Sequence, residues 1–282
     1  MAQRKCLNLV GCVMLGWGIS GTADAARTQL ITLQVEPQLA GQPVMCGASY
    51  PLQGADGVTV RFADLRLFVS AIELVDVEGR AVPLRLEQDG RWQYRDTVLL
   101  DFEDGQVSCA NGSSEQHRVI TGRIQPGRYR GLRFMLGVPA RFNHQDATLA
   151  PSPLNQTALF WSWQGGYRFM KLELDVLQNG QVSGFPIHLG STGCQSSSNH
   201  QPATRCRQPN RVQVDLPDFD LATDRVRIDL STLIAHTRLA SPTPNTAPGC
   251  MSAPDDPDCD GVLSALGLTG GNSQRVFGVV KP

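Results

Sequence analysis

Two histidines and two tryptophans are the residues of this chain best suited to metal and redox chemistry. His144 and His188 each follow an apolar segment, and Trp161 and Trp163 lie between them, separated by a single residue. Neutral imidazole is a common ligand of copper and zinc, and an indole ring can be oxidised. Because the chain has no His-x-His or His-x-x-x-His pair, a metal site would need ligands that the fold brings together.

The other three histidines have simpler interpretations. His200 lies in a polar loop and His117 follows an Asn-Gly-Ser loop, so we expect both to be exposed. His236 follows an apolar segment, and we favour a capping role for it over a role as a third ligand.

A serine hydrolase is a weaker alternative. Ser191 lies among glycines, but residues 190–193 lack the Gly-x-Ser-x-Gly spacing and the α/β context of that motif. His117, His188 and Asp101 would form a triad only if the fold happened to assemble them. A turn before a disulfide is the interpretation that we favour for this segment.

The acidic segment 256–261 resembles the start of a calcium-binding loop, in which alternate carboxylates face one cation. Asp256, Asp258 and Asp260 would be the ligands of a weak calcium site. The twelfth position of the loop is Gly267, so the bidentate glutamate is missing. We therefore favour a solvated acidic loop that is closed by a disulfide.

The N-terminus predicts export. Two basic residues precede an apolar run over residues 7–19, and residues 23–25 supply small side chains where a signal peptidase reads the chain. We expect a cleaved signal peptide over residues 1–25 and a periplasmic or secreted product. The run is shorter than the ~20 residues that a membrane span needs, and it continues past Cys12, which disfavours a lipoprotein.

The charge balance argues against nucleic acid and membrane partners. Removing Arg4, Lys5 and Asp24 from 25 basic and 26 acidic residues leaves 23 and 25, a net charge of −2 with neutral histidines. No later segment is long and apolar enough to span a bilayer. The mature protein is therefore expected to be soluble.

Six of the eight cysteines lie after the predicted signal peptide, and an even number in an oxidising compartment predicts disulfides. The sequence alone does not choose among the many pairings. Proximity favours two short loops and leaves a third pair, which gives Cys194–Cys206, Cys250–Cys259 and Cys46–Cys109. Since there is no Cys-x-x-Cys pair, thiolate ligation of a metal is disfavoured.

Apolar and polar residues alternate through much of the chain, which is the period of β-strands. Residues 58–77 predict a pair of strands, residues 28–35 an edge-like strand that ends at Pro37, and residues 262–266 one helical turn. With frequent turn signals and no long amphipathic helix, the predicted fold is all-β, an antiparallel sandwich or barrel-like domain. We expect a single domain over residues 26–282, in which residues 240–282 form a loop-rich extension with long disulfide-pinned loops elsewhere.

Taken together, six segments resemble the MbnP-like family, the extracytoplasmic copper-binding proteins of methanobactin and metallo-mystery-pair systems. The resemblance covers nearly all of the mature chain. The segments are Asp64–Ser70, Leu100–Gly105, Gly131–Pro139, Asn143–Asn155, Trp161–Lys171 and His188–Cys194.

The resemblance implies a mononuclear copper site and a modified tryptophan. In this family a partner di-haem cytochrome peroxidase oxidises a tryptophan to kynurenine, which then supports metal binding. The matching residue is Trp161 or Trp163, and the sequence does not separate them. The implied ligands are His144 and His188, and the chain is expected to act in copper homeostasis as a substrate of the peroxidase, not as an enzyme.

The surroundings of the implied site remain open. Asn143 and Asp146 are candidates to fix an imidazole tautomer, and Tyr167 is a candidate relay for an electron hole. Some relatives carry a further histidine where this chain has Ser70, so the full ligand set is undetermined. The alternative function is a carbohydrate-binding module, in which Trp161, Trp163 and Tyr167 would form a stacking platform.

Overall fold

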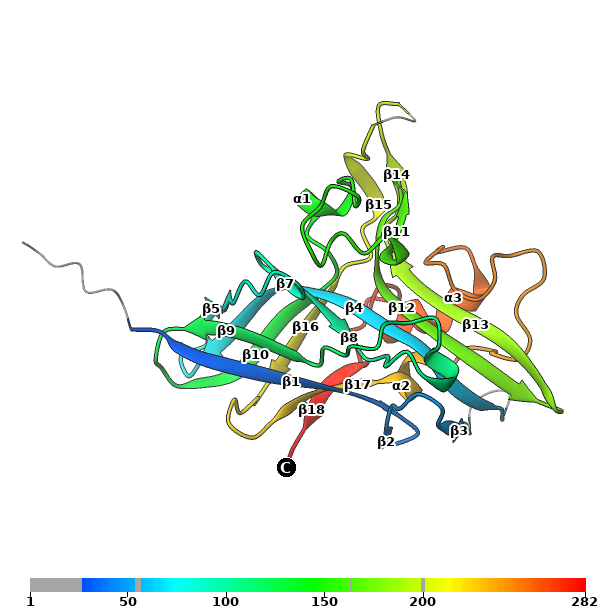
Figure 1. Ribbon diagram of the computed structural model, residues 1–282, viewed down its shortest axis with the longest axis horizontal. Helices are drawn as coiled ribbons and strands as arrows, with labels where there is room; N and C mark the ends of the chain where they lie inside the picture. Colours follow the sequence, from blue (N-terminus) through cyan, green and yellow to red (C-terminus); the bar gives the residue numbers. More distant parts are fainter. Residues whose placement is uncertain (1–26, 54–56, 163, 199–200) are drawn as a thin grey trace, which may run out of the picture.

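One long strand, β4 (Thr59–Asp76), is the central element of the largest sheet. On one side its first half pairs with β12 (Gly166–Gln178) and its second half with β10 (Tyr129–Leu136), which pairs in turn with β16 (Val212–Pro217). The other side carries the short strands β3 (Ser49–Pro51), β5 (Ala81–Pro83) and β8 (Thr97–Asp101), with β7 (Gln93–Tyr94) beyond β8. The computed structural model (Figure 1) describes residues 27–53, 57–162, 164–198 and 201–282.

The predicted pair of strands over residues 58–77 is wrong, because β4 crosses the whole sheet without a turn. Ala71 has a φ of 50°, and the register between β4 and β10 shifts beside it. A β-bulge bends a strand without ending it, so one strand serves two sets of neighbours. The alternating pattern is the same in both arrangements, and periodicity therefore did not distinguish them.

The second large sheet is built around β1 (Gln29–Leu39), which is antiparallel to β9 (Val119–Ile124) and parallel to β17 (Arg225–Asp229). The sheet is completed by β18 (Phe277–Val280), β6 (Arg85–Leu86) and β2 (Gln42–Pro43). The predicted edge strand ending at Pro37 is wrong, because β1 is internal and continues to Leu39. Proline lacks only the N–H group, and the Pro37 carbonyl still accepts a hydrogen bond from Val44 N at 3.0 Å.

Apolar side chains of the two sheets pack against each other. Leu33 of β1 and Val69 of β4 are each 1% exposed. Phe134 of β10 meets Phe277 of β18 edge to face, with ring centroids 5.4 Å apart. The predicted all-β sandwich is confirmed, with the parallel β1–β17 pair as a departure from the antiparallel pattern.

The helices are short. They are α1 (Ala140–Asn143), α2 (Leu230–Ile234), α3 (Pro257–Ala265) and the 3-10 turns η1 (Val107–Cys109) and η2 (Thr157–Leu159). Within the described residues, no helix has the length and apolar character needed to cross a bilayer.

The predicted helical turn over residues 262–266 is too short, since α3 begins at Pro257. Asp256 caps α3 by accepting a hydrogen bond from Asp258 N, and Pro257 occupies the first turn, where proline is favoured. Asp258 accepts hydrogen bonds from Thr243 N and Oγ1. These contacts correct the calcium-loop interpretation, because the segment is the start of a helix and not a cation-binding loop.

A small projection rises from one side of the body, above β4 in Figure 1. β13 (Gln181–Gly190) pairs with β12 after the turn at residues 179–180, and β11 (Phe160–Ser162) pairs with the start of β12. β14 (Thr192–Gln195) and β15 (Arg205–Gln208) form a two-stranded sheet of their own, which projects together with α1.

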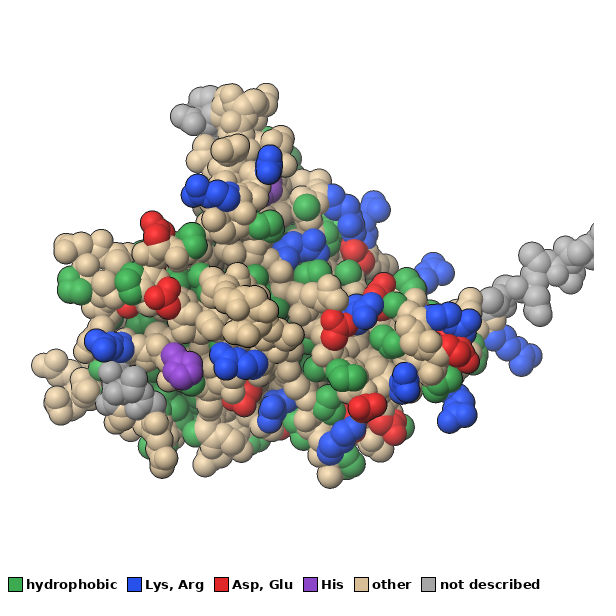
Figure 2. Space-filling view, turned by 180° about the vertical axis from the view of Figure 1, so that it is seen from behind, with side chains coloured by type: hydrophobic (Ala, Val, Ile, Leu, Met, Phe, Trp, Pro, Cys, Tyr) green, Lys and Arg blue, Asp and Glu red, His purple; other side chains and the backbone are tan. Residues whose placement is uncertain are grey.

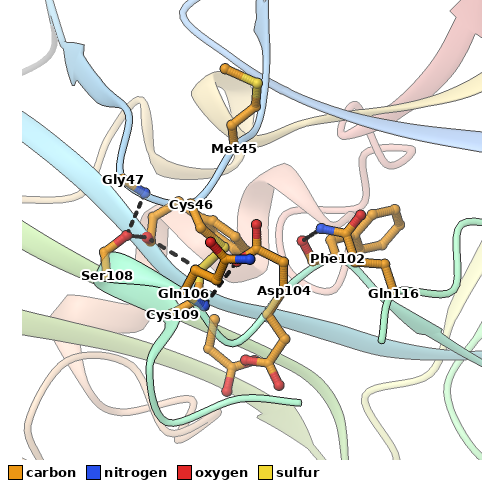
Figure 3. The surroundings of a disulfide bond; sticks show 12 residues. Met45, Cys46, Gly47, Phe102, Asp104, Gln106, Ser108, Cys109 and Gln116 are labelled. Atoms are coloured by element: carbon orange, nitrogen blue, oxygen red, sulfur yellow. Dashed lines mark hydrogen bonds between the residues drawn. A yellow bond between two sulfur atoms is a disulfide. The ribbon is translucent and has the colours of Figure 1, made fainter. Parts of the chain in front are cut away.

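Three disulfides join the pairs favoured by sequence proximity, Cys46–Cys109, Cys194–Cys206 and Cys250–Cys259. Cys46–Cys109 ties the loop before β3 to η1 (Figure 3). Beside it, Ser108 Oγ accepts a hydrogen bond from Gly47 N at 2.8 Å and donates one to Phe62 O at 2.6 Å. The loop containing η1 is thereby fixed against β4.

Candidate metal site

His188 lies at the end of a set of charged side chains that crosses three neighbouring strands. In the sheet register, Arg66 of β4 is opposite Lys171 of β12, and Lys171 is opposite His188 of β13. In the adjacent row, Asp64 is opposite Glu173. Directly opposite residues have Cβ atoms about 5 Å apart, so the register of the three strands alone brings these five side chains together.

These side chains form a continuous series of ion pairs. Arg66 Nη2 and Nε donate to the two carboxylate oxygens of Asp64 at 2.5 and 3.0 Å. Lys171 Nζ lies 2.6 Å from Asp64 Oδ2 and 3.0 Å from Glu173 Oε1. Glu173 Oε1 is in turn 3.3 Å from His188 Nε2. The hydrogen bond with His188 and the contacts with Lys171 lower the pKa of Glu173 to about 2, so this carboxylate is ionised at neutral pH.

Two buried carboxyl groups lie at the other end of the series. Glu103 is 0% exposed, and its Oε1 is 3.4 Å from Arg66 Nε. Its Oε2 is buried and makes no hydrogen bond to the part of the chain that the structure describes. Burial, reinforced by repulsion from Asp64, raises the pKa of Glu103 to about 7, and burial raises the pKa of Asp101 to about 6. This end of the series therefore exchanges protons near neutral pH.

Asn143, the last residue of α1, links His144 to the ends of β12 and β13. Its Oδ1 accepts a hydrogen bond from Tyr167 N at 2.9 Å. Its Nδ2 lies 3.1 Å from His144 Nε2 and 3.2 Å from the Oγ of Ser191, which directly follows β13. Gly166 permits this approach, because a Cβ on it would lie 2.5 Å from Asn143 O and its φ is +75°.

His144 is 9% exposed and lies against the disulfide of the β14–β15 hairpin. Its Nε2 is 3.4 Å from Cys206 Sγ, and a ring nitrogen and the sulfurs of Cys194 and Cys206 lie within 4.8 Å of one another. The sulfurs are bonded to each other and offer no thiolate. Asn143 Oδ1 is fixed as an acceptor, so its Nδ2 donates to His144 Nε2, which places the proton of the neutral ring on Nδ1.

Trp161 of β11 lies beside His188 on the same face of β13. A Cβ on Gly190 would overlap the six-membered ring of Trp161. Gly190 and His188 are alternate residues of one strand, so their side chains share a face and are about 7 Å apart. The guanidinium carbon of Arg168 is 5.8 Å from the centre of the Trp161 ring. Trp163, the other candidate for oxidation, lies outside the described residues.

Comparison with known proteins assigns the family. The model of the MbnP family matches residues 28–252. This chain belongs to the MbnP family. MbnP from Methylosinus trichosporium, a solved structure, is 31% identical, with a TM-score of 0.80 over 90% of this chain and 99% of that chain. No curated protein matches. The resemblance inferred from the sequence is confirmed, and membership supports a copper-related role outside the cytoplasm.

Copper is associated with the MbnP family, and one feature of this chain fits such an ion directly. His188 Nδ1 is buried and has no hydrogen-bond partner among the described residues. Buried ring nitrogens are normally paired, and a neutral imidazole nitrogen is a suitable copper ligand. Nδ1 of His188 is thus free to bind a metal on the strand face where Trp161 packs. By contrast, Nε2 of His144 already accepts a hydrogen bond from Asn143.

Two predicted neighbours of the MbnP site have other partners. The Asp146 carboxylate accepts hydrogen bonds from Thr148 N and Oγ1, which closes its own turn. Tyr167 is 0% exposed, and its hydroxyl donates to Leu154 O. Burial, with a smaller contribution from Asp146, raises the pKa of Tyr167 to about 12. A fully buried Tyr167 does not belong to an exposed stacking platform, which removes one of the three residues of the carbohydrate-binding alternative.

The remaining sequence candidates have structural roles. Ser191 Oγ donates to Pro209 O and accepts from Asn143, which does not suit a nucleophile paired with His188. His117 was expected to be exposed, but it stacks on Trp92 with ring centroids 5.1 Å apart. Burial lowers the pKa of His117.

The sequence also singled out Ser70, His236 and His200. Ser70 is buried and donates to Gly137 O at 2.7 Å. His236 is exposed after α2. His200 lies outside the described residues.

The charged series that includes Lys171 and Glu173 was not predicted from the sequence. The sequence does show charged residues at alternate positions of two segments, Asp64 and Arg66 in β4 and Lys171 and Glu173 in β12. Alternation usually indicates a solvated face, but here Asp64 and Arg66 are only 3% and 8% exposed, and Glu103, from the segment after β8, lies against Arg66. Only the pairing of β4, β12 and β13 shows that these charges adjoin His188.

Proposed function

We propose that this protein binds one copper ion outside the cytoplasm, with His144 and His188 as ligands, and that it is a substrate of a modifying partner and not an enzyme. The observation that supports this best is the unpaired Nδ1 of His188, buried beside Trp161. Two neutral imidazoles with a weaker third donor would suit Cu(I), and a further ligand or water would suit Cu(II).

The contacts of Asn143 support a shared site for the two histidines. Asn143 Nδ2 reaches His144 on one side and Ser191, just beyond the end of β13, on the other. Binding of a metal through His144 Nε2 would replace the hydrogen bond from Asn143 and leave Ser191 as its partner.

We further propose that Trp161 or Trp163 is oxidised to kynurenine by a di-haem peroxidase. Two equivalents of hydrogen peroxide would reoxidise the haem protein as it removes four electrons from the indole. Oxygen from peroxide or water would add as the five-membered ring opens, and the ring carbon C2 would leave as formate. The product would carry an aniline nitrogen and a ketone as polar groups near the metal. Tyr167 is a poor relay, because its pKa is about 12 and its hydroxyl donates to a backbone carbonyl, which does not take up the proton. The oxidation would therefore stay on the indole.

Metal analysis of single-histidine variants tests the copper site. His144→Ala and His188→Ala should each lower the copper-to-protein ratio after dialysis against a competing chelator. His236→Ala is the matched control, because His236 is exposed beyond α2. Equal copper content in all three variants and the unaltered protein would contradict the proposed ligands.

Peptide mass spectrometry tests the modification. The protein, Trp161→Phe and Trp163→Phe should each be co-expressed with a di-haem peroxidase. One tryptophan-containing peptide should lose a carbon and gain an oxygen, and only one of the two substitutions should abolish that change. Unmodified peptides in the presence of active peroxidase would rule out this part of the proposal and leave copper binding to the histidines as a separate question.

A further inference from the structure

We infer that Glu173 is the positioning residue that makes His188 an Nδ1 ligand, and that Lys171, Asp64 and Arg66 hold Glu173 in place. This inference rests on the proposed copper site and names the ligating atom in it. It does not require the oxidation of a tryptophan.

The backbone of His188 is already fixed on its outer edge. Its N–H donates to Cys250 O at 2.9 Å, and its carbonyl accepts from Ser252 Oγ at 2.7 Å. On the inner edge β13 pairs with β12. The orientation and tautomer of the imidazole are therefore left to the side-chain contacts.

Glu173 determines the tautomer. A carboxylate only accepts hydrogen bonds, so the contact at 3.3 Å requires a hydrogen on His188 Nε2. In the neutral ring Nδ1 then carries a lone pair, and this is the nitrogen that is buried without a partner. Carboxylate-bound imidazoles of this kind are common at metal sites, where the carboxylate orients the ring and raises its basicity.

The rest of the series keeps Glu173 in its place. The Glu173 side chain is 37% exposed and would otherwise be free to turn to solvent. Lys171, only 14% exposed, holds it through Nζ while bonding Asp64 on its other side. Arg66 in turn binds both oxygens of Asp64. The positive charge of Lys171 is thus anchored at a fixed position next to Glu173.

Nitrogen-15 NMR of the metal-free full-length protein reads the tautomer directly. The unaltered protein should show His188 with a protonated Nε2 and an unprotonated Nδ1. Glu173→Leu should shift the population toward the other tautomer and weaken copper binding by about 10–100-fold. Asp175→Leu is the matched control, since Asp175 lies two residues along the same face of β12 and pairs with Arg61.

The possible outcomes separate the inference from the proposed function. An unchanged tautomer and unchanged copper affinity in Glu173→Leu would overturn the inference. A changed tautomer in a protein whose unaltered form binds no copper would support the positioning role and contradict the copper site. Lys171→Met should shift the His188 tautomer population in the same direction but by less. A larger tautomer shift in Lys171→Met than in Glu173→Leu would also overturn the inference.

Discussion

The six-membered ring of Trp161 lies over Gly190, and the glycine is required because a Cβ there would overlap the ring and approach the carbonyl of Tyr167. Gly190 shares a strand face with His188, so this contact sets how near the indole comes to the imidazole. Because Gly190 has no Cβ, the Trp161 ring can pack on the face of β13 that also carries His188.

Gly190→Ala should displace Trp161. We expect a loss of about 1–3 kcal/mol in unfolding free energy, as for other overpacked sites, and a changed near-ultraviolet circular dichroism spectrum. The yield of modified peptide should also fall. Gly184→Ala is the control, because a Cβ at this position of β13 meets nothing within 4 Å. Equal spectra and yields for the two variants would show that the Trp161–Gly190 contact is not needed.

The extent to which the sequence predicted the structure depends on whether the interactions are local. The all-β class follows from alternation among neighbouring residues, and strands such as β10 and β12 carry that alternation. The length of β4 was not predicted, because a bulge at Ala71 and a turn leave the same alternating pattern. The partners of His188 lie on two other strands, and sequence spacing carries no information about that register.

Glu103→Gln should flatten the pH dependence of stability. The folded protein raises the pKa of Glu103 from 4.5 to about 7, so it binds this proton more tightly than the unfolded chain does. The stabilisation that this tighter binding adds to the free energy of unfolding is complete below about pH 4.5 and is lost as pH rises toward 7. Urea unfolding should show a loss of about 1–3 kcal/mol between pH 5 and 8 in the unaltered protein, and a smaller loss in the variant.

The control for this pH series is Glu115→Gln, because Glu115 is 54% exposed and pairs with Arg91 at the surface. Its pH profile should follow that of the unaltered protein. A Glu103→Gln profile as steep as that of the control would show that another group, such as Asp101, is responsible for the loss.

Replacing Cys194 and Cys206 by serine should weaken copper binding. β14 and β15 pair with each other, and the disulfide between them lies 3.4 Å from His144 Nε2. The control is the serine variant of Cys46 and Cys109, whose disulfide spans 63 residues where Cys194–Cys206 spans 12. Chain-entropy estimates are about 4 and 3 kcal/mol respectively. The control should therefore unfold more easily yet retain more copper, and the reverse order of affinities would contradict a role for the hairpin in placing His144.

The projecting hairpin is basic, which predicts a salt-sensitive encounter with the proposed di-haem partner. Arg205 and Arg207 are exposed on β15, and no acidic residue occurs between Asp175 and Asp215. Figure 2 shows basic side chains on the projecting part of the molecule. Exposed charges are screened over about 10 Å at 0.1 M salt, and complementary charges act mainly on the association rate.

The double variant Arg205→Glu, Arg207→Glu should therefore be modified several-fold more slowly by an acidic partner at low salt, and raising the salt concentration should reduce the difference from the unaltered protein. The matched control reverses Arg128 and Arg130, which are exposed at the opposite end of β10 from the projecting hairpin. Initial rates of peptide modification at low and high ionic strength measure the effect. Equal slowing in both double variants would assign it to net charge, whereas an effect of the hairpin variant alone identifies this face as the one that the partner approaches.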